Sequence, residues 1–179
     1  MTKQRPNSRS DVPWTKRQEI PDRQIVGAAD QYAAACELLE PRSGVLLPQI
    51  NAAAVSVELY LKSLSAERIY TADADMPEMS VVSAYPAKAS HSLREQFGEI
   101  SEEIRDQLIA AYNTKLRPEL KDDLETALKK IDGAFSASRY PFEQGADVSK
   151  YSLPHLMGLA KFLREFVKSI PPQDLVWRR

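Results

Sequence analysis

The sequence contains few cysteines, histidines and glycines, and each shortage excludes a class of protein. The single cysteine, Cys36, excludes a disulfide within the chain and with it the disulfide-stapled secreted domains. Together with the two histidines, His91 and His155, it forms no cluster with metal-ligand spacing, so we expect neither a metal nor a cofactor. The six glycines are scattered along the chain, which excludes a glycine-rich phosphate-binding loop.

Net charge and long hydrophobic runs are also missing. The 24 basic and 25 acidic side chains give a formal net charge of -1, so RNA or nucleotide binding would need a local basic patch. No stretch approaches the roughly 18 consecutive apolar residues that a membrane span requires. The first ten residues lack the apolar segment of a signal peptide. These features predict a cytoplasmic protein that does not bind membranes.

The distribution of residue types predicts one folded domain with two short ends. Residues 1–20 contain five basic and two acidic side chains and two prolines, a composition that buries too little apolar surface to order itself. We therefore expect a flexible basic arm over residues 1–20, a helical domain over residues 21–172 and a carboxy-terminal tail over residues 173–179.

Apolar residues recur every three or four positions through most of the domain, which predicts amphipathic helices. The predicted helices cover about residues 22–39, 48–66, 92–100, 101–111, 118–139 and 154–170. Residues 70–90 show no sustained period and are predicted to form a long loop. No stretch alternates with period two over a useful length, so we expect no sheet.

The predicted fold class is therefore all-α, an antiparallel bundle of four to five main helices with a flexible basic amino-terminal arm. Helix 48–66 combines a continuous apolar stripe with small neighbours such as Ala52, Ala53 and Ser56. Small side chains let other helices approach closely, so we expect this helix to be the most buried.

Four short stretches resemble, in their order and spacing, the HEPN-like superfamily (higher eukaryotes and prokaryotes nucleotide-binding). The resemblance spans about residues 22–170 and rests on Val57–Lys62, on His91-Ser92-Leu93 leading to Phe97, on Asp132–Phe135 and on Arg139–Glu143. It implies an antiparallel helical bundle, often dimeric, that is associated with nucleotides, RNA or toxin–antitoxin pairs.

Catalytic members of the superfamily cleave RNA without metal, using an arginine followed by four to six residues and a histidine. Such chemistry needs a cation on the scissile phosphate and a group that moves the ribose 2′-hydroxyl proton. This chain departs from the pattern, because neither histidine follows an arginine at that distance. The nearest match runs from Lys150 to His155, and lysine lacks the planar fork that grips phosphate oxygens.

Glu58, Lys62, His91, Arg139 and Glu143 are the polar residues within the four stretches. One interpretation makes them a pocket, with Arg139 and Lys62 on a phosphate and His91 donating a hydrogen bond or proton. The other interpretation makes them a structural latch in which Glu58 pairs with Arg139. We favour the latch, because charges inside a helical bundle persist mainly when they are paired.

The leading hypothesis is a non-catalytic HEPN-like module that binds a partner protein, a nucleotide or RNA, as a homodimer, in a toxin–antitoxin or defence context. The alternative is a divergent metal-independent ribonuclease or toxin that uses Lys150 with His155, or Arg139 with His91. A third hypothesis is an interaction subunit without a ligand. The sequence does not choose the ligand or the dimer surface.

Overall fold

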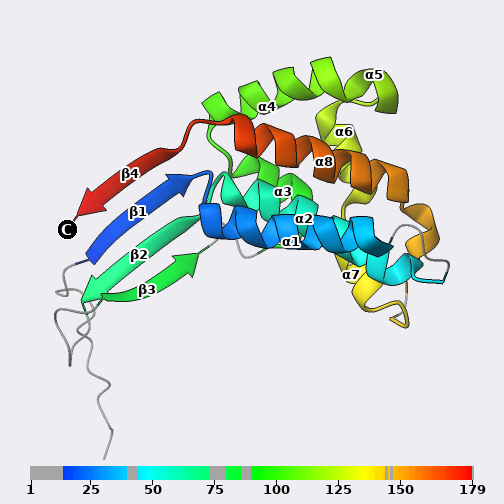
Figure 1. Cartoon of the computed structure of the whole chain (residues 1–179), viewed down its shortest axis with the longest axis horizontal. Helices are drawn as coiled ribbons and strands as arrows, with labels where there is room; N and C mark the ends of the chain where they lie inside the picture. The colour runs from blue at the N-terminus through cyan, green and yellow to red at the C-terminus, as the bar shows by residue number, and fades with distance from the viewer. Residues whose placement is uncertain are drawn as a thin grey trace, which may run out of the picture.

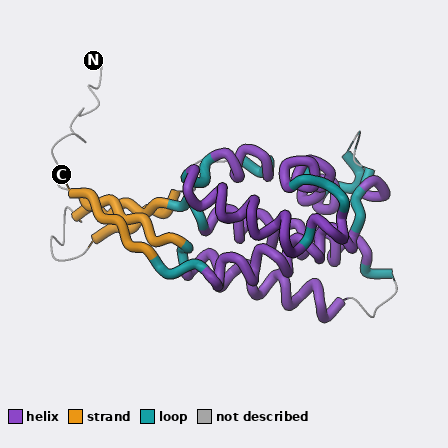
Figure 2. The backbone as a smooth tube through the Cα atoms, turned by 90° about the horizontal axis from the view of Figure 1, so that it is seen from above, coloured by secondary structure: helices purple, strands orange, loops and turns teal. Residues whose placement is uncertain are grey.

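A computed structural model describes residues 14–39, 44–72, 80–85, 90–143, 145 and 147–178. The described chain forms a helical body and a four-stranded antiparallel sheet that extends from one end of that body (Figures 1 and 2). The protein is therefore mostly helical, but the prediction of a purely all-α fold is wrong.

The helices follow the predicted periodicity closely. They are α1 (Arg23–Leu39), α2 (Leu46–Ser63), α3 (Leu93–Gly98), α4 (Glu102–Lys115), α5 (Arg117–Leu120), α6 (Leu124–Ile131), α7 (Ala134–Arg139) and α8 (Leu153–Ser169), with a single 3₁₀ turn at Val148–Lys150. Ser92 and Ser152 cap α3 and α8, because each side-chain oxygen accepts a hydrogen bond from the amide three residues later, that of Glu95 and that of His155.

Helix α2 lies at the centre of the helical body and contacts α1, α3, α7 and α8. Most of its residues are buried, including the small residues Ala52, Ala53 and Ser56. The prediction that this helix is the most buried is confirmed. The reason is the expected one, because small side chains on several faces let neighbouring helices approach the α2 backbone.

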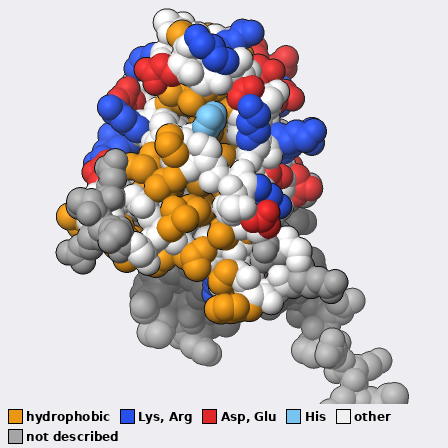
Figure 3. Space-filling view, turned by 90° about the vertical axis from the view of Figure 1, so that its right-hand side faces the viewer, with side chains coloured by type: hydrophobic (Ala, Val, Ile, Leu, Met, Phe, Trp, Pro, Cys, Tyr) orange, Lys and Arg blue, Asp and Glu red, His pale blue; other side chains and the backbone are white. Residues whose placement is uncertain are grey.

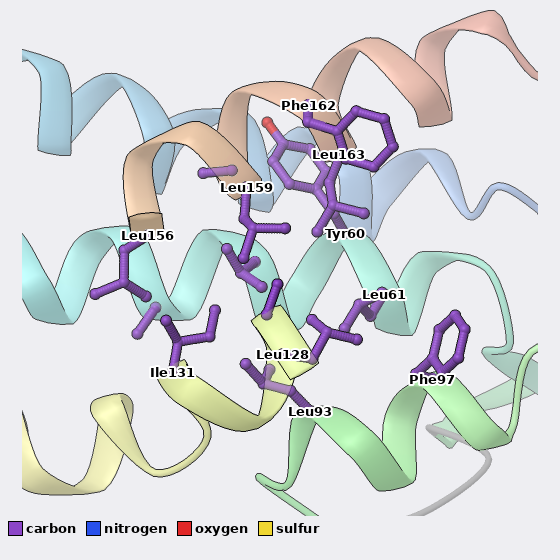
Figure 4. Packing of buried hydrophobic residues seen from close by; sticks show 14 of the residues in the cluster. Tyr60, Leu61, Leu93, Phe97, Leu128, Ile131, Leu156, Leu159, Phe162 and Leu163 are labelled. Atoms are coloured by element: carbon purple, nitrogen blue, oxygen red, sulfur yellow. The ribbon is translucent and has the colours of Figure 1, made fainter. Parts of the chain in front are cut away.

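The hydrophobic core forms where α2 meets the helices α3, α6 and α8. Figure 4 shows side chains from α2, α3, α6 and α8 pointing into one cluster. The fully enclosed residues in it include Leu61, Leu128, Leu159 and Leu163, each with an exposed fraction of 0%. Burial of each such leucine contributes roughly 1.5–3 kcal/mol.

The predicted helix 118–139 is divided into α5, α6 and α7. Lys121 adopts a left-handed backbone with φ of 66°, which ends α5. Asp123 then accepts the Thr126 amide at 2.7 Å and starts α6. Gly133, with φ of 82°, separates α6 from α7, and a Cβ there would lie 3.1 Å from the Tyr151 hydroxyl. The left-handed backbone favours glycine at that position, and a Cβ there would crowd the Tyr151 hydroxyl.

The sheet has the strand order β3-β2-β1-β4 and joins segments far apart in sequence. Its strands are β1 (Trp14–Ile20), β2 (Glu67–Ala72), β3 (Ser80–Tyr85) and β4 (Gln173–Arg178). Strand β1 pairs antiparallel with both β2 and β4, in registers that set Lys16 opposite Ile69 and Trp177.

Three predictions are corrected by these strands. Residues 14–20 belong to β1 rather than to a flexible arm, and residues 173–178 belong to β4 rather than to a tail. The segment predicted as a loop, 70–90, contains half of β2 and all of β3. Residues 1–13, the rest of the predicted arm, lie outside the described residues.

Asp22 connects the sheet to the helical body. Its Oδ1 accepts the amides of Gln24 and Ile25 at 3.0 and 3.1 Å and so caps the first turn of α1. The same oxygen accepts a hydrogen bond from Arg68 of β2 at 2.6 Å. The carboxylate is almost completely buried, so this one side chain ties the start of α1 to β2.

Candidate functional site

The four stretches that carry the HEPN-like resemblance meet in one place. Helix α2 brings Glu58 and Lys62, and the residues before α3 bring His91. The α6–α7 turn and α7 bring Asp132, Phe135 and Arg139. Contacts between these elements turn four separate sequence patterns into a single site.

Glu58 is the buried anion of this site, with a side-chain exposure of 7%. Its carboxylate accepts a hydrogen bond from Lys62 Nζ, one turn later on α2. The two carboxylate oxygens also lie 3.0 and 3.2 Å from His91 Nδ1. A buried carboxylate is costly unless it is paired, and Lys62 and His91 supply that pairing.

His91 is held from inside but faces solvent, because 62% of its side chain is exposed. Its ring centroid lies 4.8 Å from that of Phe135. When Nδ1 of the neutral ring carries the proton and donates a hydrogen bond to Glu58, Nε2 keeps a free lone pair. Glu58 and Phe135 thus fix both the tautomer and the orientation of an exposed imidazole.

Arg139, the last residue of α7, contacts the same aromatic ring. Its guanidinium carbon lies 5.6 Å from the centroid of Phe135 and 5.3 Å from that of Tyr140. Among the described residues no carboxylate pairs with Arg139, which is exposed. The rings hold the cation through their π faces while its N–H donors stay available.

Asp132 fixes the segment that carries His91. Its Oδ1 accepts the Leu93 amide at 2.9 Å, and its Oδ2 accepts the Ser92 hydroxyl at 3.1 Å. Gln96, buried in α3, donates to the Ser90 carbonyl at 2.8 Å. Backbone on both sides of His91 is therefore anchored to neighbouring side chains.

A groove of about 550 Å³ lies beside Arg139, between α1, α2 and α7. Its walls combine aromatic, aliphatic and hydrogen-bonding side chains: Tyr32, Leu47, Pro48, Asn51, Val55, Phe135, Ser138 and Arg139. The Asn51 amide donates to the Ser138 hydroxyl at 3.2 Å across the groove floor. The arrangement can hold a flat apolar ring next to an anion.

The end of the helical body opposite the sheet is also apolar on its surface. Figure 3 shows hydrophobic side chains across the middle of this end, with Lys, Arg, Asp and Glu above them and to either side. Exposed large hydrophobic residues of the helical body are Tyr32, Leu38, Leu46, Tyr140 and Phe142.

The predicted latch between Glu58 and Arg139 is wrong. Glu58 pairs with Lys62 and His91, and Arg139 rests on aromatic rings. The physical expectation behind the latch holds, because the buried carboxylate is indeed paired. Only its partner differs, since the short helix α7 directs Arg139 toward Phe135 and Tyr140 instead of toward α2.

The remaining predicted residues lie apart from this cluster. The Lys150 ammonium lies 5.1 Å from the centroid of Tyr151, and His155 Nδ1 lies 2.9 Å from the Ser152 hydroxyl at the start of α8. No contact joins Lys150 to His155 within the described residues. Glu143 is exposed, and its amide donates to the Tyr140 carbonyl.

Phe135 and Asp132 belong to this cluster, but the sequence reasoning did not select them as candidate site residues. Both occur in the Asp132–Phe135 stretch of the resemblance, but a phenylalanine on a helix is more often a core residue, and the spacing does not show that His91 and Arg139 share its ring. Only the packing of α3 and α7 against the same helix, α2, does so.

Within the described ranges, no group of three or more His, Cys, Asp or Glu side chains has a metal-binding arrangement.

No helix in the described part of the chain combines the length and the apolar character needed to cross a bilayer.

In comparisons with known proteins, no protein-family model, no curated protein and no solved structure matches the chain.

Proposed function

We propose that this chain is a non-catalytic HEPN-like module that binds a nucleotide unit, free or within RNA, in the groove between α1, α2 and α7. The observation that carries the proposal is Arg139, an exposed cation without a carboxylate partner among the described residues. An exposed arginine side chain that has no carboxylate partner can bind a phosphate through two parallel hydrogen bonds.

The groove beside Arg139 suits the other half of a nucleotide. Phe135 and Tyr32 offer aromatic surface, and Tyr32 is 43% exposed. Bases stack on such rings without strong sequence preference, and each stacked base contributes roughly 1–3 kcal/mol. Asn51 adds an amide that can bond a base edge. Because the net charge of the chain is -1, attraction of a phosphate has to come from a local cation, and Arg139 beside its aromatic neighbours supplies one.

Fluorescence anisotropy with a labelled single-stranded RNA 12-mer and competition by AMP tests the proposal. Arg139→Ala is expected to weaken RNA binding about tenfold or more, because a charge-assisted hydrogen bond contributes roughly 1.5–3 kcal/mol. The slope of log Kd against log salt should fall by about 1. The melting temperature should stay the same, since Arg139 is exposed and unpaired with any acid.

Arg94→Ala is the matched control, because Arg94 is an exposed arginine on α3 outside the groove. It should change the RNA Kd less than twofold. Equal losses in both variants would indicate non-specific charge attraction and would contradict the groove. Unchanged binding in Arg139→Ala would contradict the proposal directly.

A divergent metal-independent ribonuclease is the second candidate, favoured by the contact between His91 and Glu58. An exposed imidazole whose Nδ1 faces a buried carboxylate has the arrangement of a general base, and Arg139 contacts the same Phe135 ring. Here Nε2 would take the 2′-hydroxyl proton while Arg139 holds the scissile phosphate.

Incubation of the purified chain with mixed RNA and a chelator separates the two candidates. Intact RNA supports the non-catalytic module. Cleavage that is lost in His91→Ala but kept in His155→Ala would replace it by the ribonuclease. Cleavage lost only in His155→Ala would instead move the chemistry to the start of α8.

The proposal includes the wider features that the resemblance implies. These are an antiparallel arrangement of the helices, a homodimer, and a partner protein in a toxin–antitoxin or defence context. The cytoplasmic location that the composition predicts is also part of the proposal. The apolar end of the helical body in Figure 3 offers room for that partner beside the groove.

A further inference from the structure

The sheet stands away from the hydrophobic core. Figures 1 and 2 show it extending beyond the helices, and no described helix lies along either of its faces. Among the sheet side chains that the structure describes, only that of Ile20, at the end of β1, joins the core cluster. With both faces free of described helices, the outer strands of the sheet are open to pairing with a further strand, and β4 is one of them.

Strand β4 forms an outer edge of this sheet without the usual protection. It contains no proline and no lysine, and its regular register with β1 over six pairs leaves no room for a bulge. Leu175 and Val176 point to opposite faces, yet they are 42% and 47% exposed. Such an edge is a template for another strand.

The charges of the sheet argue against nucleic acid as the partner. Every lysine or arginine whose side chain is described in the sheet already has a carboxylate partner. Lys16 pairs with Glu67, Arg17 with Asp174, and Arg68 with Asp22. A phosphate backbone would have to displace these carboxylates, whereas the backbone hydrogen bonds of another strand would not.

The sequence of β4 is complementary to itself in the antiparallel direction. Alternate residues of a strand share a face, so Asp174, Val176 and Arg178 occupy positions on one face and Leu175 and Trp177 on the other. With Val176 on a twofold axis, Asp174 of one copy lies opposite Arg178 of the second. Leu175 then lies opposite Trp177. In the order of residues, an acidic position therefore lies opposite a basic one and an apolar position opposite an aromatic one, on either side of the central Val176.

We propose that β4 pairs antiparallel with β4 of a second copy, centred on Val176, so that the two four-stranded sheets form one continuous sheet. Backbone hydrogen bonds between the two edges supply the affinity. The complementary order of Asp174, Val176 and Arg178 supplies the register. The surface is separate from the groove at Arg139, so this inference stands independently of RNA binding.

Sedimentation equilibrium of Val176→Glu and Val176→Lys, alone and mixed, tests the pairing. The unaltered chain should sediment as a dimer. Each variant alone should sediment as a monomer at the same concentration, because like charges face each other across the axis. An equimolar mixture should recover the dimer, since glutamate then faces lysine.

Leu38→Lys is the control for a general loss of apolar surface, because Leu38 is 74% exposed at the end of α1. It should remain dimeric, and all variants should keep the far-ultraviolet circular dichroism of the unaltered chain, which reports the fold and not the association. A monomeric unaltered chain, which would leave the edge to a strand of another protein, overturns the proposal. Dissociation by Leu38→Lys, or no recovery in the mixture, also overturns it.

Discussion

The helical body and the sheet are stabilised in different ways. The body buries large side chains where α2 meets α3, α6 and α8. Ion pairs such as that of Arg164 with Asp30 lie at the margin of this core. The sheet has no covering layer among the described residues, and exposed ion pairs such as that of Arg17 with Asp174 cross its strands. Burial therefore determines the stability of the body, whereas the stability of the sheet depends on its edges and on its junction with α1.

The largest expected effect is in the core of the body. Leu163 of α8 is completely buried, so Leu163→Ala should lower the free energy of unfolding by roughly 2–5 kcal/mol. Leu175→Ala, the same change in β4, should stay within about 0.5 kcal/mol because Leu175 is already 42% exposed. Urea denaturation measures both, and similar losses would show that the sheet is packed as tightly as the body.

The second effect is at the junction. Arg68→Ala would leave the buried Asp22 carboxylate with its two backbone hydrogen bonds but no cation, at a cost of roughly 1–3 kcal/mol. Amide hydrogen exchange should become faster in β1 and β2 while α8 stays protected. Unchanged protection of the strands would show that Asp22 does not connect the two regions.

A smaller effect is expected at the ion pairs that join α1 to α8. Burial acts to raise the pKa of Asp30, but hydrogen bonds from Lys168 and Tyr60 and the charge of Arg164 outweigh it, so the pKa lies below its usual value. Ionised Asp30 therefore stabilises the fold above pH 4, and this contribution disappears as pH falls through the lowered pKa.

Asp30→Asn should consequently lower stability by about 1 kcal/mol at pH 7, and the difference from the unaltered chain should shrink below about pH 4. Thermal melts over a pH series measure this. A difference that grows on acidification would mean that Asp30 is protonated in the folded protein at neutral pH.

The smallest effect is expected on the sheet surface. Arg17 and Asp174 form a bidentate pair that is nearly half exposed, with side-chain exposures of 46% and 45%. Water and salt screen such pairs, so Arg17→Ala should leave the melting temperature within experimental error. A clear drop would show that a second layer covers this pair in solution.

The candidate site could be predicted in its residues but not in its contacts. The four stretches of the resemblance contain Glu58, Lys62, His91 and Arg139, and the need for a partner to Glu58 follows from its place on a buried helix. The choice of partner does not follow. It depends on Gly133, which lies between α6 and α7. The short helix α7 then places Arg139 beside the ring of Phe135.

The sequence by itself determined the helices and the central burial of α2. Helical hydrogen bonds join residues four apart, so the apolar period and caps such as Ser92 and Ser152 are local information. Only the tertiary structure decided the sheet and the partner of Glu58. The Arg17–Asp174 hydrogen bonds span 157 positions, and a strand with mixed polar and apolar residues is stable only when its neighbours are already in place.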